Sequence, residues 1–387
     1  MREHAQQIYL DYNATTPVHA EVRAAMLPWL GERWGNPSSG HSFGWAAAAA
    51  IASARAEIAA LVGATPEEMI FTSGGTEADN LALFGACQGP GHLLTSAIEH
   101  PAVSAAAAML IRQGWSADLL PVSANGRVSL AETRALLNER ARVDLFSVIC
   151  AQNETGAIQP VAALAEMVRK HAPNAVVHSD GAQAVGKIPV DVGELGVDLL
   201  TIVSHKLYGP AGVGALYCRQ GIELRPRLFG GGQERGMRPG TEPVALIVGF
   251  GAAAALARRT LDTEIRRQKD LRELLWGRLA AAIPGIYRTV PAEYALPNTL
   301  HVCLPGVRGS EVLARAPTVA ASVGSACHSG QVDAVGVLGA MSLPPEFAAG
   351  ALRLSLGRGS ERSEIITASD ALAEAWRALT AVKATCR

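Results

Sequence analysis

The chain has 387 residues, 49% of them hydrophobic, and a formal net charge of −1. This length exceeds the size at which one hydrophobic core usually stops growing, so we expect one large domain and a smaller one. Because the charge is near zero and no dense block of Lys or Arg occurs, we expect no nucleic-acid or membrane partner, and small polar ligands or proteins are favoured instead.

The N-terminal segment MREHAQQIYLDYNATT has no apolar core of the kind that signal peptides carry. The stretch from Pro243 to Ala257 is apolar but too short to span a bilayer, which predicts a buried core helix. Six cysteines are scattered without a C-x-x-C pair or a His-rich zinc spacing. We therefore expect free thiols, no metal site and a cytoplasmic location.

Along the chain, apolar runs alternate with longer stretches of helical spacing. The alanines at 46–50 begin a predicted helix that continues through SARAEIAALV and ends at Gly63. The runs VDLFSVIC, AVVHSD and VDLLTIVS are apolar throughout, which indicates strands buried on both faces. The pattern predicts an α/β fold with a mostly parallel sheet between helices.

Polar residues follow five of the predicted strands. Ligands of such sheets bind at the carboxyl ends of the strands, so these residues are expected to converge on one site. The polar segments are 72–76 after EEMIF, 99–100 after LLTSAI, 152–154 after FSVIC, 179–180 after VVH and 204–206 after LLTIV.

Two glycine-containing segments resemble phosphate-binding loops. In TSGGTEADN, Gly75 would let the backbone approach an anion and Thr76 would add a hydroxyl, although an ordinary helix N-cap fits the same residues. GAQAVGK has the glycine and lysine spacing of a P-loop, but Ile188 stands where Ser or Thr must bind magnesium. Nucleoside triphosphate binding is therefore excluded for the second segment.

Asp180 and Lys206 each end an apolar run. An ionised carboxylate at a buried strand end is costly unless it meets a cation, although a turn cap is an alternative for Asp180. A solvated turn lysine is the alternative for Lys206. A cofactor with a protonated pyridine nitrogen, an aldehyde and a phosphate would use Asp180, Lys206 and Thr76 together.

Beyond residue 258 the sequence changes to a charged predicted helix and then to strands near NTLHVCLPG and ALRLSLG. We place a boundary there, with a large domain at 16–259 and a small domain formed by 1–15 and 260–387. Cys327 lies in the Gly- and Ser-rich segment ASVGSACHSG and is either an inert buried thiol or a reactive one. Arg353 is either ion-paired or a clamp for a substrate carboxylate.

A series of motifs along the chain resembles those of the class V, fold-type I pyridoxal phosphate enzymes. In chain order they are YLDYNATTPVHAEV, GNPSSGHSFG, TSGGTEADN, EHPAV, QNETGAIQP, HSDGAQAVGKIPVDV, SHKLYGP, GGGQERGMRPGTE, GSACHSG and LRLSLGR. Within that family they resemble the cysteine desulfurases and selenocysteine lyases, over nearly the whole chain. The resemblance implies the fold-type I transferase fold, a mostly parallel sheet between helices plus a smaller α+β domain that carries the Cys327 segment.

The resemblance also implies roles for individual residues. Lys206 resembles the Schiff-base lysine and proton carrier, Cys327 the catalytic cysteine, and His100 the catalytic imidazole stacked on the cofactor ring. Arg353 resembles the substrate carboxylate clamp, with Asn153 beside the substrate. The pyridoxal 5'-phosphate contacts implied are Gly75, Thr76, His100, Asn153, Asp180, Gln183, Ser204, His205, Lys206 and Thr241, the last reaching the other subunit of a homodimer.

Three functional hypotheses follow. The first is a cysteine desulfurase that converts L-cysteine to L-alanine, transfers the sulfur to Cys327 as a persulfide and passes it to an acceptor protein, with activity on L-selenocysteine as well. The second is a dedicated selenocysteine lyase that releases selenide, favoured by His328 directly after Cys327 and by Ala334 where housekeeping desulfurases commonly carry proline. The third is a weakly catalytic pyridoxal-phosphate-binding protein that serves as a sulfur-relay partner. An aminotransferase is disfavoured because the GSAC segment has no role in transamination.

Overall fold

The computed structural model describes residues 7–87, 89–140, 142–323 and 336–385. Its centre is a seven-stranded sheet in the order β2-β8-β7-β6-β5-β3-β4. Because β8 is antiparallel to both of its neighbours, it runs opposite to the other strands of this sheet. The strands are β2 Met69–Thr72, β3 His92–Ser96, β4 Ser116–Leu120, β5 Leu145–Ser147, β6 Val176–Asp180, β7 Leu199–Val203 and β8 Gly214–Cys218.

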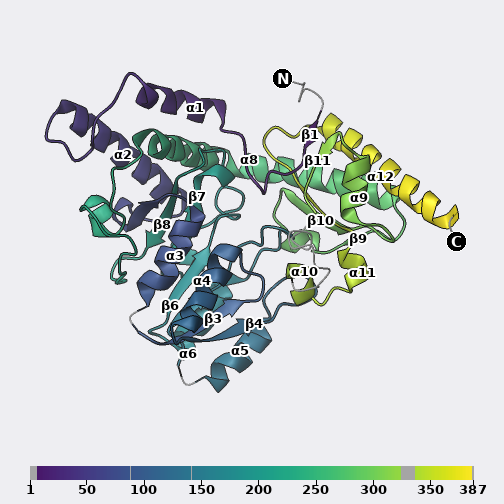
Figure 1. Ribbon diagram of the computed structural model, residues 1–387, viewed down its shortest axis with the longest axis horizontal. Coiled ribbons are helices and arrows are strands. Elements are labelled where there is room, and N and C mark those ends of the chain that lie inside the picture. Colours follow the sequence, from purple (N-terminus) through teal and green to yellow (C-terminus); the bar gives the residue numbers. More distant parts are fainter. Residues whose placement is uncertain (1–6, 88, 141, 324–335, 386–387) are drawn as a thin grey trace.

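Helices cover the central sheet on both faces, which confirms the predicted α/β architecture (Figure 1). The predicted alanine-rich helix is α2, and Gly63 follows it with a φ of 70°, as expected for a glycine just past a helix end. The helices associated with this part are α1 Ala20–Met26, α2 Ser42–Leu61, α3 Gly75–Ala86, α4 Pro101–Arg112, α5 Leu130–Glu139, α6 Val161–His171 and α7 Val192–Leu195.

The second part of the protein contains two smaller sheets. One is the antiparallel sheet β12-β10-β9 and the other pairs β1 with β11 in parallel. The strands predicted near NTLHVCLPG and ALRLSLG are β10 and β12. The remaining elements are β1 Ile8–Tyr9, β9 Tyr287–Arg288, β10 Thr299–Cys303, β11 Val319–Ala320, β12 Ala351–Ser355, α9 Gly309–Arg315, α10 Val337–Ala340, α11 Pro345–Ala348 and α12 Arg362–Thr385.

One long helix, α8 Val244–Ala282, joins the two parts. The sequence predicts two helices here, one apolar and one charged, but the structure has a single continuous helix. The predicted boundary at 259/260 therefore falls inside α8. Ile247 and Phe250 pack in the core around the large sheet, whereas Leu271 and Leu275 pack in a second core with β10 and β12. The division into two domains stays a prediction, since one rigid helix belongs to both cores.

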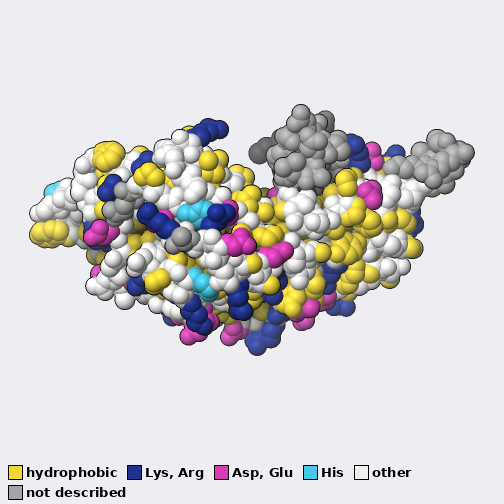
Figure 2. All heavy atoms as spheres, turned by 90° about the horizontal axis from the view of Figure 1, so that it is seen from below, with side chains coloured by type: hydrophobic (Ala, Val, Ile, Leu, Met, Phe, Trp, Pro, Cys, Tyr) yellow, Lys and Arg dark blue, Asp and Glu magenta, His cyan; other side chains and the backbone are white. Residues whose placement is uncertain are grey.

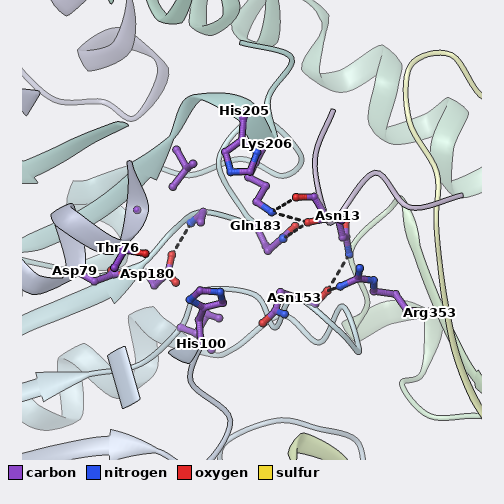
Figure 3. A pocket seen from close by; sticks show the side chains of 15 residues that line it. Asn13, Thr76, Asp79, His100, Asn153, Asp180, Gln183, His205, Lys206 and Arg353 are labelled. Carbon is purple, nitrogen blue, oxygen red and sulfur yellow. Dashed lines mark hydrogen bonds between the residues drawn. The ribbon is translucent and has the colours of Figure 1, made fainter. Parts of the chain in front are cut away.

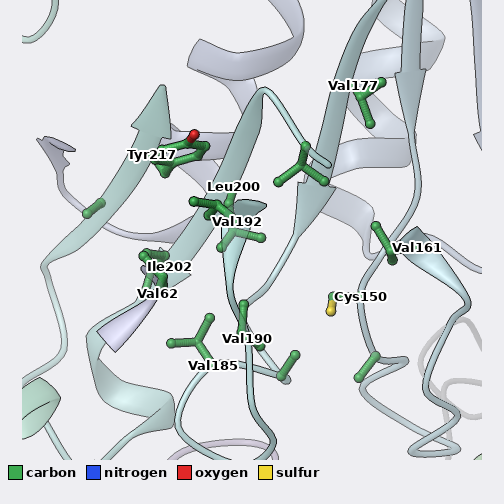
Figure 4. Packing of buried hydrophobic residues seen from close by; sticks show 14 of the residues in the cluster. Val62, Cys150, Val161, Val177, Val185, Val190, Val192, Leu200, Ile202 and Tyr217 are labelled. Carbon is green, nitrogen blue, oxygen red and sulfur yellow. The ribbon is translucent and has the colours of Figure 1, made fainter. Parts of the chain in front are cut away.

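By length and composition α8 could cross a membrane, yet several of its apolar residues are buried in the core of the protein. Ile247, Phe250, Ala253 and Ala254 are completely buried, which confirms the prediction of a core helix at 243–257. Figure 4 shows the adjoining core, where Val62, Val185, Leu200 and other aliphatic side chains fill the space beneath the sheet. Each such side chain contributes about 1.5–3 kcal/mol when fully buried.

Candidate active site

A cavity of about 390 Å³ lies at the carboxyl ends of the sheet strands. Each of the five strand ends predicted from the sequence contributes to it, because six of the seven strands run in the same direction. The residues that line it are Asn13, Ala14, Gly75, Thr76, Asp79, His100, Ile149, Asn153, Asp180, Ala182, Gln183, Val203, His205, Lys206 and Arg353. Figure 3 shows Thr76 and Asp180 toward one side of this cavity and Arg353 toward the other.

The Lys206 amine projects into this cavity from the turn after β7 (Figure 3). Its Nζ donates hydrogen bonds to the backbone oxygens of Asn13, at 2.7 Å, and Ala14, at 2.6 Å. Burial lowers the pKa of Lys206 to about 8, and the positive charge of Arg353 acts in the same direction. A substantial fraction of this amine is therefore neutral near physiological pH, which excludes an ordinary solvated turn lysine.

Asp180 ends β6 with its side chain buried. Its Oδ1 accepts a hydrogen bond from the Ala182 backbone N–H at 2.8 Å, and no ion pair forms between Asp180 and a described cation. Burial raises the pKa of Asp180, while the Ala182 hydrogen bond and the electrostatic interactions with His100 and Lys206 oppose that rise. The site thus holds a carboxylate that a cationic ring nitrogen would stabilise.

The end of β2 and the start of α3 form a site suited to an anion. The N-cap residue of α3 is Gly74, whose φ of 151° favours glycine and which provides no side-chain cap, so the ordinary Ser or Thr N-cap is excluded. A Cβ on Gly75 would lie 2.8 Å from Val203 Cγ2, which explains the second glycine. Gly75 and Thr76, in the first turn of α3, line the cavity, so backbone N–H groups of the kind that lack a partner within a helix lie beside it.

His100 is the N-cap of α4, and its Nδ1 accepts a hydrogen bond from the Ala102 backbone N–H at 3.2 Å. Since a backbone N–H can only donate, this bond leaves Nε2 as the nitrogen that carries the proton. His205 bonds Thr15 Oγ1 through Nδ1, and burial followed by the charges of Lys206 and Lys187 lowers its pKa to about 4. Both imidazoles line the cavity, as predicted.

Arg353 enters the cavity from β12, in the second part of the protein. Its Nη2 bonds Asp11 Oδ1 at 2.7 Å and Ser322 Oγ at 3.0 Å, and its Nη1 bonds the Asn153 backbone oxygen at 3.1 Å. Among the residues that the structure describes, its buried Nε finds no hydrogen-bond partner. The Arg353 side chain lines the cavity, and a guanidinium placed there is suited to bind a substrate carboxylate.

Two predicted cofactor contacts do not line the cavity. Ser204 is fully buried, and a Cβ on neighbouring Gly209 would lie 2.1 Å from its Oγ, so this hydroxyl packs behind the wall while Val203 faces the cavity. Thr241 lies on the exposed loop before α8. Glu99 and Ser179, from the predicted strand ends, point into the core instead. The cofactor roles of Ser204 and Thr241 stay predictions, and Cys327 lies outside the described residues.

Two residues with polar side chains that line the cavity, Asn13 and Asp79, were missed by the sequence interpretation. Asn13 has no local signal, because the segment that carries it reaches the sheet only through the tertiary fold. Asp79 lies one helical turn after Thr76 on α3, a spacing that could have placed it on the same face. Burial raises its pKa well above the usual value, and the negative charge of Asp180 acts in the same direction.

The residues of this cavity fit a phosphate-bearing pyridine aldehyde. The first turn of α3 suits the phosphate, the buried Asp180 carboxylate suits a protonated ring nitrogen, and the partly neutral Lys206 amine suits an aldehyde carbon. These three features lie around one space, as the predicted assignment of Thr76, Asp180 and Lys206 requires.

Comparison with known proteins gives one family and several close relatives. The aminotransferase class V family model matches residues 8–367. The cysteine desulfurase IscS of Dictyoglomus turgidum is 40% identical over 95% of this chain and 94% of that protein. A solved structure of a NifS-like protein has 34% identity, covers 95% of this chain and 98% of its own and gives a TM-score of 0.89. The solved structure of SspA in complex with cysteine is 33% identical in sequence, and the match covers 90% of this chain and 98% of the SspA chain with a TM-score of 0.75.

Proposed function

The chain belongs to the class V aminotransferase family, and from this premise we propose that it is a pyridoxal-phosphate-dependent cysteine desulfurase that converts L-cysteine to L-alanine. Relatives that carry this name match it over nearly its whole length. The observation that carries the proposal is the arrangement of three groups around one cavity, namely the Lys206 amine, the Asp180 carboxylate and the Arg353 guanidinium.

Pyridoxal phosphate, when bound, supplies an electron sink that makes the Cα–H bond of an amino acid acidic. The first turn of α3 and Thr76 would hold its phosphate, together with His205, while Asp180 would hold its ring nitrogen protonated. Lys206 would hold its aldehyde carbon. Gln183 and Asn153 line the part of the cavity near Arg353 and Asn13 and would hold its phenolic oxygen.

The chain's own residues then position the substrate and move its protons. Arg353, whose side chain lines the cavity, binds the carboxylate and so orients the amino acid between β12 and Lys206. The neutral form of Lys206 takes the Cα proton, and its lowered pKa makes that form available. His100 can donate a hydrogen bond to the substrate through Nε2–H, since its Nδ1 accepts from the Ala102 backbone N–H.

Cys327 carries the sulfur step in this proposal. Its thiolate attacks the substrate sulfur, so that an S–S bond forms as the Cβ–S bond breaks, and the electron pair of that bond remains with the three-carbon fragment. Protonation of the fragment then gives alanine. The enzyme thiol becomes a persulfide, which an acceptor protein reduces or takes over. Cys327 lies outside the described residues, so the support for this step comes from the motif GSAC and from the family relationship.

Cys327→Ala is expected to reduce alanine formation from L-cysteine at least roughly 100-fold, because the nucleophile that accepts the sulfur is gone. The measurement is kcat by alanine release, combined with mass spectrometry for one added sulfur atom on the Cys327 peptide. Cys218→Ala is the matched control, since burial raises the pKa of that thiol to about 11 and it lies away from the cavity. Full alanine release by Cys327→Ala would contradict the persulfide step.

A dedicated selenocysteine lyase is the second candidate, favoured by His328 beside Cys327. It is separated from the desulfurase by kcat/KM on L-cysteine and L-selenocysteine, since that ratio reports transition-state discrimination. Comparable values support the desulfurase with additional activity on selenocysteine, and activity on selenocysteine alone supports the lyase. A yellow protein that makes no alanine from either substrate would instead favour the sulfur-relay partner.

A homodimer is part of the proposal. Five large hydrophobic side chains in the segment from Leu27 to Trp45 are exposed, Trp34 by 67% and Trp45 by 64% of their surface, and exposed apolar side chains of this kind mark protein interfaces. Trp34 and Phe43 pack against each other with ring centroids 5.4 Å apart. The exposed residues are Leu27, Leu30, Trp34, Phe43 and Trp45. Thr241 would then reach the phosphate site of the partner chain.

Light scattering of the purified protein is expected to give close to twice the 40.4 kDa mass of one chain. Trp45→Glu is expected to shift the mass toward one chain, because a charge would be buried in the apolar interface. An exposed-site control is Lys170→Glu on α6, outside the patch. A monomeric wild-type protein that is fully active would contradict the contribution of Thr241 across the interface.

The sulfur acceptor is proposed to be a protein that binds on the surface near the cavity. On the face shown in Figure 2, basic and acidic side chains are interspersed, so no single-sign field selects a strongly charged partner there. The described cysteines are free thiols, which agrees with the proposed location in the reducing cytoplasm.

A further inference from the structure

Lys187 ends the GAQAVGK motif, and the proposed function leaves this residue without a role. Its Nζ donates hydrogen bonds to Asn13 Oδ1, at 2.9 Å, and Gln183 Oε1, at 2.5 Å. In the part of the chain that the structure describes, no carboxylate forms an ion pair with it. Burial lowers its pKa well below the usual range, and the positive charges of Lys206 and Arg353 act in the same direction. Partly burying a lysine without an acidic partner costs free energy, because the amine loses contact with water. The two hydrogen bonds that hold Lys187 in this position therefore point to a role for it.

A lysine ammonium donates hydrogen bonds and accepts none, so the atoms that face Lys187 must be the amide oxygens of Asn13 and Gln183. Even the neutral amine retains two N–H groups, which is enough for these two acceptors. The amide nitrogens are thereby turned away from Lys187. Gln183 Nε2 bonds the Asn13 backbone oxygen at 2.9 Å, and Asn13 Nδ2 bonds Thr299 Oγ1 at 2.9 Å.

The same network reaches the reactive amine. The Asn13 backbone oxygen that accepts from Gln183 also accepts from Lys206 Nζ, at 2.7 Å. Asn298 Nδ2 donates to Asn13 Oδ1 at 3.0 Å, so the oxygen that faces Lys187 has a second donor that fixes the same orientation. Figure 3 shows Asn13 between Lys206 and Arg353, beside Gln183. Lys187 does not line the cavity and therefore acts through its neighbours.

We propose that Lys187 is a positioning residue that fixes the Gln183 amide with its N–H side toward the cavity, where the second Nε2 hydrogen donates to the anionic ring oxygen of the bound cofactor. This inference rests on the proposed function. Without Lys187 the Gln183 amide can turn by 180°, and its oxygen would then face an anion. The charged and titratable groups around this position are Lys206, Arg353 with Asp11, Asp79, Asp180, His100 and His205.

The test is a pH titration of the visible absorbance of the holoenzyme. Pyridoxal phosphate held by Lys206 would supply a titratable proton beside its ring oxygen, and a hydrogen-bond donor from Gln183 to that oxygen would favour loss of the proton. In Lys187→Met this donor is lost and so is any positive charge on Lys187, and both changes favour the protonated form. The midpoint of the absorbance change is therefore expected to rise by about one pH unit.

Three further variants separate the positioning role of Lys187 from other effects of its replacement. Lys187→Arg retains the donors and is expected to keep the midpoint near the wild-type value, and Lys170→Met removes an exposed lysine on α6 as a control. Gln183→Leu is expected to raise the midpoint as Lys187→Met does, and the double variant is expected to raise it by clearly less than the sum of the two single shifts, because both act through one amide.

Additive shifts, or an unchanged midpoint in Lys187→Met with normal cofactor binding, would overturn the positioning role. If Lys187→Met fails to fold, the comparison of Lys187→Arg with Gln183→Leu decides, since a shift in Lys187→Arg as large as that of Gln183→Leu would also overturn it. A wild-type protein that binds no pyridoxal phosphate would instead overturn the proposed function, and the two failures are thereby distinguished.

Discussion

Lys206→Ala is expected to reduce alanine formation from L-cysteine at least about 1,000-fold. The variant removes the amine that holds the cofactor and the base that takes the Cα proton, and positioned general bases alone contribute roughly 10²–10⁴-fold to rates. No other described amine occupies the same position, because Lys187 is held behind Asn13 and Gln183. The measurement is kcat under saturating pyridoxal phosphate.

Controls for this variant separate chemistry from folding. Lys170→Ala, on the exposed surface of α6, is expected to keep full activity. Lys206→Ala is expected to keep the thermal stability of the wild type or exceed it, since it removes a buried amine whose desolvation is unfavourable. Wild-type turnover in Lys206→Ala would remove Lys206 from the mechanism.

The wild-type pH profile gives a second readout of Lys206. Its base form is the neutral amine, and burial, with the charge of Arg353, lowers the pKa to about 8 from an ordinary value of 10.5. The rate of Cα proton removal is therefore expected to rise as pH increases through about 8, and to level off well below pH 10. The measurement is the substrate deuterium isotope effect on kcat as a function of pH.

Asp180→Asn is expected to lower kcat at least roughly 100-fold. Asparagine has nearly the same shape but no charge, so it cannot hold the ring nitrogen protonated, and the electron sink is weakened. Burial raises the pKa of Asp180, and a ring cation would offset that desolvation, which is why the effect is expected in kcat and in cofactor affinity together. Cofactor release by equilibrium dialysis and kcat are the two measurements.

Asp79→Asn provides the contrast to Asp180→Asn. Both carboxyl groups are buried beside the cavity, and two like charges so placed cannot both ionise readily. Burial and the negative charge of Asp180 raise the pKa of Asp79, so its ionised form is disfavoured and a neutral amide of nearly the same shape is expected to be tolerated there. We expect less than about a tenfold loss of kcat. Equal losses in both variants would mean that the ring nitrogen does not depend on the charge of Asp180.

The polar residues of the cavity were predictable where they follow strands. Thr76, His100, Asn153, Asp180 and Lys206 each lie just after an apolar run, and the parallel direction of those strands brings their ends together. Apolar runs, glycine positions and helix stops are local signals, so the α/β class and the elements β6, β7, α2 and α3 could be predicted from them. Most of the predicted site residues thus line one cavity.

Which partners these residues meet was decided by the tertiary structure. Asp11 and Arg353, which are hydrogen-bonded, are 342 positions apart in the sequence, and Lys187 and Asn13 are 174 positions apart. No periodicity or motif spacing carries information over such sequence separations. Val203 lines the cavity and Ser204 does not, because the turn after β7 packs Ser204 against Gly209. The continuity of α8 through residue 260 depends on two separate cores that each bury part of one helix. The sequence by itself determined which residue types end the strands, because that is a local property, whereas hydrogen-bond partners arise only when distant segments pack together.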